Sequence, residues 1–166
     1  MRNYAKELSG QLIAQLNEEL EEGRKVFICT HKDVEPVLMT CDEKLNPEEK
    51  KWMTGHWGYV DGSNQWKDCD TAVIFGLPYR PDTWTANVFM ALQGPQSDEW
   101  LQDSNSREYG GYLDIRKALK HGQITTSIIQ AINRIRCRKV IDDQGNCPKA
   151  DVYILLPKDE LADDIL

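Results

Sequence analysis

The alternation of apolar and polar positions predicts a chain of alternating helices and strands. Residues 3–22 place leucines on one side of a helix and glutamates on the other. Two short continuous apolar runs, 25–30 and 71–75, are typical of strands buried on both faces. The other predicted elements are a helix with Pro36 in its first turn, a helix start at Asn46, a strand at 57–60, helices at 82–92, 109–120 and 124–138, a strand at 151–156 and a short tail helix at 158–166.

The segment 124–138 has the most regular helical pattern. Its apolar residues share one face, as in a helix that covers a core: Ile124, Ile128, Ala131, Ile132 and Ile135. The opposite stripe carries Gln130, Asn133 and Arg134, with Arg138 beside them. This stripe has two interpretations, a solvated basic face or a surface that holds phosphate.

Strands that alternate with helices indicate one α/β domain over residues 1–166 with a mostly parallel sheet. Residues 93–108 lack periodicity and are predicted to form a long loop or insertion. Residues 142–146 predict a turn. In open parallel sheets, ligands bind beyond the carboxyl ends of the strands. The residues that follow the first strand, Thr30–Lys32, are therefore candidate functional residues.

The composition narrows the possible partners. The chain has 166 residues, 40% of them hydrophobic, and a net charge of −7. This charge argues against nucleic-acid binding by bulk electrostatics, so any such contact must come from local patches. The sequence contains neither a membrane span nor a signal peptide. Its five cysteines and three histidines lack metal-ligand spacing, which predicts reduced thiols, no metal site and a cytoplasmic protein.

The sequence lacks several motifs of self-sufficient enzymes. It has no Walker A loop, no Gly-x-Gly-x-x-Gly after a strand and no nucleophile elbow. Asp61, Asp68 and Asp70 are typical of turns and caps rather than of an acid–base pair. Cys29 and Cys137 have no evident partner base, and we expect them to be packing residues.

The order of three segments is more informative. A strand ends in Thr-His-Lys at 30–32, a Gly-Ser-Asn turn at 62–64 precedes a strand ending in Gly-Leu-Pro-Tyr-Arg at 76–80, and Gln-x-x-Asn-Arg begins at Gln130. In this order the chain resembles the second RecA-like lobe of superfamily-2 helicases, including DinG-like ones. Residues 58–79 resemble the fifth helicase motif, and residues 130–138 resemble the sixth, Gln-x-x-Gly-Arg-x-x-Arg. The resemblance implies a three-layer, RecA-like fold related to the P-loop NTPases.

The resemblance also implies roles for the sixth motif. Gln130 and Arg134 match the family's positions, and its arginines act on the γ-phosphate of ATP bound to the first lobe. Asn133 replaces a glycine of the motif, and Cys137 stands where the last arginine is expected. Arg136 and Arg138 flank that cysteine, and Arg138 is the preferred substitute because a helix would continue the stripe of Arg134 into it.

By the same resemblance, other positions would contact nucleotide or nucleic acid. Gly62 and Asn64 would join Gln130 and Arg134 at the nucleotide. The nucleic-acid backbone, DNA or RNA, and its bases would be contacted by Thr30, His31, Lys32, Ser63, Trp66, Tyr79 and Arg80.

The resemblance further implies that ATP and Mg²⁺ bind only in a complete enzyme, in which a Walker-containing first lobe is the partner. Two other interpretations remain: a non-enzymatic interaction module that keeps the fold, and a small-molecule enzyme with a deep pocket of perturbed carboxylates at the strand ends.

Overall fold

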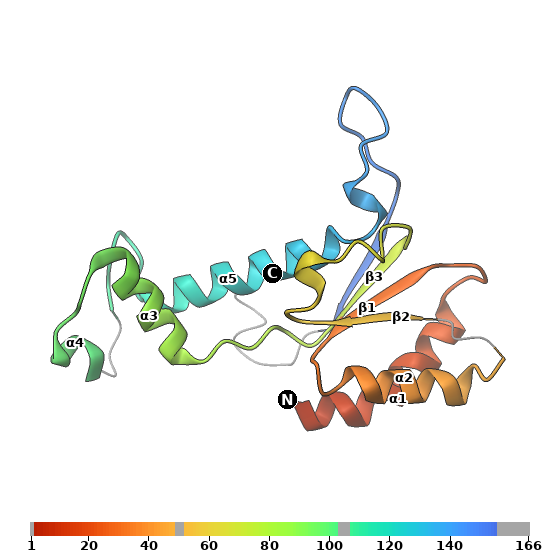
Figure 1. Cartoon of the computed structure of the whole chain (residues 1–166), viewed down its shortest axis with the longest axis horizontal. Helices are drawn as coiled ribbons and strands as arrows, with labels where there is room; N and C mark the ends of the chain where they lie inside the picture. The colour runs from red at the N-terminus through yellow and green to blue at the C-terminus, as the bar shows by residue number, and fades with distance from the viewer. Residues whose placement is uncertain (1, 49–51, 103–106, 156–166) are drawn as a thin grey trace.

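The computed structural model describes residues 2–48, 52–102 and 107–155 (Figure 1). Its helices are α1 (Arg2–Glu19), α2 (Glu35–Leu45), α3 (Asp82–Gln93), α4 (Asp98–Gln102) and α5 (Ile115–Ile132), with two 3₁₀ helices, η1 (Val60–Gly62) and η2 (Arg136–Arg138). Its strands are β1 (Val26–Thr30), β2 (Met53–His56), β3 (Thr71–Phe75) and β4 (Asp151–Leu155). The predicted tail helix at 158–166 lies outside the described residues.

The strands form one four-stranded parallel sheet in the order β2-β1-β3-β4. β1 and β3 lie in the middle, and every residue of both is buried. Their continuous apolar sequences therefore fit the position of strands covered on both faces. The α/β class and the parallel sheet are confirmed, as are the strands predicted at 25–30 and 71–75.

Helices α1 and α2 cover one face of the sheet (Figure 1). Leu12, Ile13 and Leu16 of α1 pack with alternate residues of the central strands, among them Val26 and Val73. Pro36 occupies the first turn of α2, as predicted, where its missing N–H costs no helical hydrogen bond.

The carboxyl-terminal half of α5 covers the opposite face. Ile124, Ile128 and Ala131 pack there with Phe27 of β1 and Ile74 of β3. The amino-terminal half of α5 extends beyond the sheet and packs against α3 (Figure 1). The layers are thus helices, sheet and helix, as a three-layer α/β fold requires.

The helix predicted at 124–138 has different limits, and this is a correction. A single helix, α5, replaces the two predicted at 109–120 and 124–138. It begins only after Asp114, whose carboxylate accepts a hydrogen bond from the Arg116 N–H. It stops at Ile132 because Ile135 adopts an extended conformation (φ −91°, ψ −175°) and is fully buried. The arginines after it therefore do not share a helical stripe.

The second strand was also predicted at the wrong place. β2 spans Met53–His56, residues 57–59 form a turn that includes Gly58 at φ +91°, and Val60 begins η1. The sequence of β2 has little apolar character, and pairing with β1 positions it. Asn46, predicted to start a helix, instead follows the last residue of α2 and caps it.

The predicted loop 93–108 contains helix α4. Phe89 of α3 stacks on Trp100 of α4 with ring centroids 5.0 Å apart. The Arg107 guanidinium lies 4.7 Å from the Trp100 ring and donates to the Trp100 carbonyl at 2.6 Å. Arg107 therefore caps the carboxyl end of α4 and places a cation on its aromatic ring. Residues 103–106 lie outside the described part.

Two glycines provide a test of the packing. A Cβ at Gly55 in β2 would lie 2.6 Å from Cζ2 of the buried Trp66, whereas a Cβ at Gly122 in α5 would have no atom within 4 Å. We expect Gly55→Ala to lower the free energy of unfolding by about 1–3 kcal/mol through overpacking. Gly122→Ala should raise it by roughly 0.5–1 kcal/mol, because alanine favours the helix. Urea unfolding of both variants checks this pair, and equal effects would contradict the packing around Trp66.

A cluster of ion pairs around Arg24, here called the ionic bracket, joins three segments at the amino edge of the sheet. The Arg24 guanidinium donates to the Asp151 carboxylate at the start of β4 and to the Thr71 hydroxyl at 2.6 Å. Its Nε lies 3.0 Å from an oxygen of Asp70. Arg24 therefore holds the amino ends of β3 and β4 against the residues that precede β1.

This bracket predicts a pH dependence. The hydrogen bond from Arg24 holds the pKa of the Asp151 carboxyl below its usual range. The resulting stabilisation is complete above the unfolded pKa of about 3.9 and is lost as the pH falls through the lower folded value. We expect the melting temperature of Arg24→Met to decline less than that of wild type between about pH 5 and pH 3. Lys44→Met is the control for removal of a surface charge, and parallel curves for wild type and Arg24→Met would contradict the expectation.

Candidate functional site

The segment Arg134–Arg138, here called the arginine segment, meets the loop Asp61–Asn64. The guanidinium of Arg134 donates through Nη2 to the Asp61 carbonyl. Nη1 of Arg138 lies 2.8 Å from Oδ1 of Asn64 and donates to it. More than seventy positions separate the partners in each pair, 73 in one and 74 in the other, so the fold brings together two segments that the sequence assigned to one site.

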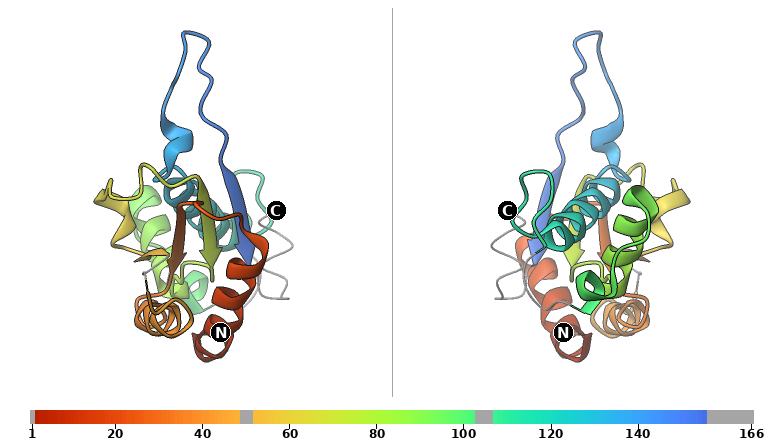
Figure 2. Two further views of the ribbon diagram at one scale, coloured as in Figure 1. Left: turned by 90° about the vertical axis from the view of Figure 1, so that its right-hand side faces the viewer. Right: turned by 90° about the vertical axis from the view of Figure 1, so that its left-hand side faces the viewer.

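Arg136 points elsewhere. Its Nε donates to the Lys149 carbonyl at 2.7 Å, and its backbone N–H donates to the Cys69 carbonyl at 3.0 Å. Residues 139–150 follow as a long loop that extends away from the sheet in both views (Figures 1 and 2). Arg136 thus fastens the base of this loop, whereas Arg134 and Arg138 face the 61–64 loop.

Cys137 also has a structural environment. Its thiol donates to the Ile132 carbonyl at 3.4 Å, next to the end of α5, and burial raises the pKa of this thiol. The position at which the sixth motif expects an arginine is therefore turned toward the helix end. A half-buried thiol with a raised pKa is a poor nucleophile, in agreement with the packing role predicted for it.

Among the described residues, no carboxylate pairs with Arg134 or Arg138, whereas the charge of Arg136 helps to lower the pKa of the Asp151 carboxyl. The side chains of Arg134, Arg136 and Arg138 donate hydrogen bonds to two backbone carbonyls and one side-chain amide oxygen. The Nε of Arg134 is buried and lacks a hydrogen-bond partner in the same part of the chain. By contrast, the neighbouring Lys139 ammonium binds Asp68 at 2.7 Å and holds the pKa of that carboxyl below its usual range. Arg134 and Arg138 thus keep their positive charges available for an anion.

The remaining nucleotide candidates are exposed. Gln130 lies on the exposed face of α5, and Gly62 lies on the exposed surface of η1. Ser63 is half-buried, and its hydroxyl accepts a hydrogen bond from the Gln65 N–H at 3.4 Å. Ser63 is a predicted nucleic-acid contact; of the predicted nucleotide contacts, Asn64 is hydrogen-bonded to the arginine segment. Among the described residues, no such hydrogen bond joins Gln130 to that segment.

A second group of candidates lies at the carboxyl edge of the sheet. Lys32 and Tyr79 are exposed there, and Arg80 is half-buried. His31 is buried, and a Cβ at Gly76 would lie 3.1 Å from its ring. His31 therefore fills the gap between the ends of β1 and β3, where ligands bind in many parallel sheets.

Two of the predicted nucleic-acid contacts, Thr30 and Trp66, have buried side chains. Thr30 is fully buried, and its hydroxyl donates to the Phe75 carbonyl at 2.8 Å. Trp66 is 1% exposed and stacks on Phe27 with ring centroids 4.4 Å apart. Both side chains belong to the core, because their hydrogen-bonding and apolar surfaces are already used inside the molecule.

Three further residues at the carboxyl edge were not among the predicted site residues. Nδ1 of His56, the last residue of β2, lies 2.6 Å from a carboxylate oxygen of Glu35 in α2. The His56 ring also stacks on Tyr59. These residues were missed because β2 was predicted at the wrong place, so that His56 was not recognised as the end of a strand.

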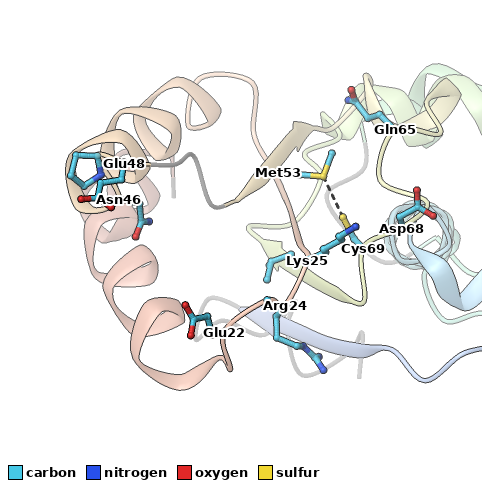
Figure 3. A pocket seen from close by; sticks show the side chains of 12 residues that line it. Glu22, Arg24, Lys25, Asn46, Glu48, Met53, Gln65, Asp68 and Cys69 are labelled. Carbon is cyan, nitrogen blue, oxygen red and sulfur yellow. Dashed lines mark hydrogen bonds between the residues drawn. The ribbon is translucent and has the colours of Figure 1, made fainter.

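A cleft of about 870 Å³ opens at the amino edge of the sheet (Figure 3). Sγ of Cys69 and Sδ of Met53 lie 3.6 Å apart in it, and burial raises the pKa of the Cys69 thiol to about 11. Of its carboxylates, Asp68 has a shifted pKa, which its pair with Lys139 lowers. This cleft lies at the edge opposite to the one where a small-molecule enzyme was expected to bind its substrate.

Within residues 2–48, 52–102 and 107–155, no group of histidine, cysteine, aspartate and glutamate side chains has the arrangement of a metal site. In the same residues, no helix has the length and apolar character needed to cross a membrane. No protein-family model matches the chain, and no curated protein or solved structure is significantly similar to it.

The contacts of the arginine segment predict separable effects on folding. We expect Arg138→Ala to change the free energy of unfolding by less than about 0.5 kcal/mol, because the side chain is exposed. Arg134→Ala should free the Asp61 carbonyl, so amide hydrogen exchange of residues 61–64 should become faster. Exchange measured by mass spectrometry on both variants checks this, with Arg116→Ala in α5 as a control. Unchanged exchange in Arg134→Ala would contradict the contact.

Proposed function

We propose that this chain is the second, RecA-like lobe of an ATP-dependent superfamily-2 nucleic-acid helicase. The observation that carries the proposal is the meeting of the 61–64 loop with Arg134 and Arg138. These are the segments that resemble the fifth and sixth helicase motifs, and in a helicase both face the nucleotide. We place the protein in the cytoplasm, in keeping with its free cysteines.

In the proposed enzyme, ATP and Mg²⁺ are bound by a separate Walker-containing lobe. The present chain supplies the guanidinium groups that contact the γ-phosphate. Phosphoryl transfer spreads negative charge over the equatorial oxygens, which planar guanidinium groups stabilise. Arg134 and Arg138 suit this role because their present acceptors are neutral oxygens. A phosphate can replace such acceptors without breaking an ion pair. Arg136 suits it less, since its guanidinium fastens the 139–150 loop.

Support for the nucleic-acid partner comes from the carboxyl edge. Lys32 presents an ammonium group to solvent beside the end of β1, and Tyr79 is 65% exposed beyond β3. The buried Nε of Arg80 lacks a hydrogen-bond partner among the described residues. Ammonium, guanidinium and aromatic groups contact phosphates and bases without reading sequence. A local patch of this kind suits a chain whose overall charge is negative.

Reconstitution tests the proposal. Alone, the chain should not turn over ATP, because it lacks a Walker A loop. Mixed with a cognate Walker-containing lobe, it should confer ATP hydrolysis that single-stranded nucleic acid stimulates. Arg134→Ala should lower the stimulated kcat by at least about 10³-fold. Arg116→Ala, which removes an arginine distant from the segment, is the matched control.

Turnover by the isolated chain, or full activity with Arg134→Ala, would refute the assignment. Binding of the other lobe without any gain in hydrolysis would instead identify an interaction module that keeps this fold.

A further inference from the structure

A series of aromatic rings leads from the core to the surface at the carboxyl edge. Phe27 of β1 stacks on Trp66, and Tyr59 meets Trp66 edge to face with centroids 6.0 Å apart. Tyr59 stacks in turn on His56, with centroids 5.5 Å apart and an interplanar angle of 25°. Trp66 is 1% exposed, whereas Tyr59 is 51% exposed. Tyr59 is therefore the member of this series that reaches solvent.

The ring of Tyr59 is held in place. The Glu35 carboxylate fixes the His56 imidazole at 2.6 Å, and this imidazole supports one side of the Tyr59 ring. The Tyr59 N–H donates to the His56 carbonyl at 3.0 Å across the turn that Gly58 makes at positive φ. A ring that is ordered before binding loses little conformational entropy when a ligand stacks on it.

The turn that carries Tyr59 lies over the ends of the central strands. The Trp57 N–H donates to the Thr30 carbonyl at 3.0 Å, and the Trp57 indole N–H donates to the Gly76 carbonyl at 3.0 Å. The turn is thus fastened to the carboxyl ends of both β1 and β3. The exposed Lys32 follows β1 at the same edge. An aromatic face and an ammonium group together suit a ligand with a planar ring and a phosphate.

We propose that Tyr59 is a stacking platform for an unpaired nucleobase of a single-stranded nucleic acid. Tyr59 takes the place that the sequence assigned to Trp66, and Glu35 and His56 position it. The proposal rests on the helicase function and deepens it by naming a base-binding residue. A nucleobase fits better than an apolar protein surface, because the exposed Tyr59 ring adjoins the polar His56–Glu35 pair and shares its sheet edge with the charged Lys32.

Fluorescence anisotropy with labelled oligo(dT) and oligo(rU) tests this platform at low salt. Tyr59→Ala should raise the Kd by about 5- to 150-fold, the range found for the loss of one stacked base. Tyr59→Phe keeps the ring and should bind nearly as wild type does. Tyr112→Ala, which removes another exposed tyrosine far along the chain, is the matched control. Circular dichroism melting shows whether each variant is folded, and Tyr59→Phe keeps the test valid if Tyr59→Ala is not. In that case Tyr59→Leu, which replaces the ring by an apolar side chain without a π-face, is the variant that measures the loss of stacking.

The outcomes separate the inference from the function. If wild type binds and folded Tyr59→Ala or Tyr59→Leu binds equally well, the platform is refuted while the nucleic-acid partner stands. If Tyr112→Ala weakens binding as much as Tyr59→Ala, the effect is not specific and the platform is also refuted. If wild type binds neither oligonucleotide, both the stacking role of Tyr59 and the proposed nucleic-acid partner are refuted. A loss of affinity for ATP alone would assign the ring to adenine and overturn the proposal for a strand.

Discussion

The backbone N–H of Arg136 donates to the Cys69 carbonyl, and the position of the arginine segment depends on this hydrogen bond. A continuing helix would direct that N–H to a carbonyl of its own preceding turn. Instead, Ile135 turns into the core and the chain crosses to the residues that precede β3. An unpaired buried N–H costs about 1–3 kcal/mol, so burial and hydrogen bonding together favour this exit from α5.

This exit brings the arginine segment to the connection between β2 and β3, which carries two kinds of proposed contact. Near its start, Tyr59 lies over the carboxyl ends of the strands. Two residues later, the Asp61 carbonyl accepts a hydrogen bond from the Arg134 guanidinium. The side-chain oxygen of Asn64 accepts one from Arg138. The proposed nucleic-acid and nucleotide contacts thus share one short segment, whose ends are fastened by Trp57 at one side and by Cys69 at the other.

The parts of the fold that were predictable are those in which local pattern and burial agree. The runs at 25–30 and 71–75 are apolar throughout because both strands lie in the middle of the sheet. β2 lies at an edge, pairs with β1 alone and has a partly exposed face, so its sequence has no strand pattern. The end of α5 was mispredicted because the isoleucine spacing continues through Ile135, although that side chain reaches the core from an extended segment.

The candidate site was predictable at the level of segments but not of contacts. The order of the motif-like segments indicated that residues 62–64 and 130–138 belong together. Arg138 donates to Asn64 within the first of these segments, and Arg134 donates to Asp61 just before it. Helical spacing favoured Arg138 over Arg136, but the premise was wrong: α5 ends at Ile132, and the turn after it directs Arg138 to Asn64 and Arg136 to Lys149. Sequence spacing did not separate buried Trp66 from exposed Tyr59, since both are aromatic residues near a turn.

The most direct test of the phosphate site is nuclear magnetic resonance of the ¹⁵N-arginine-labelled chain, mixed with an unlabelled cognate Walker-containing lobe and titrated with magnesium ATP. Substitutions of single arginines by lysine assign the Nε–Hε resonances. The resonances of Arg134 and Arg138 should shift together and saturably, while that of Arg136 stays close to its starting position. A shift of Arg136 alone, or unchanged resonances of Arg134 and Arg138, would contradict the proposed site.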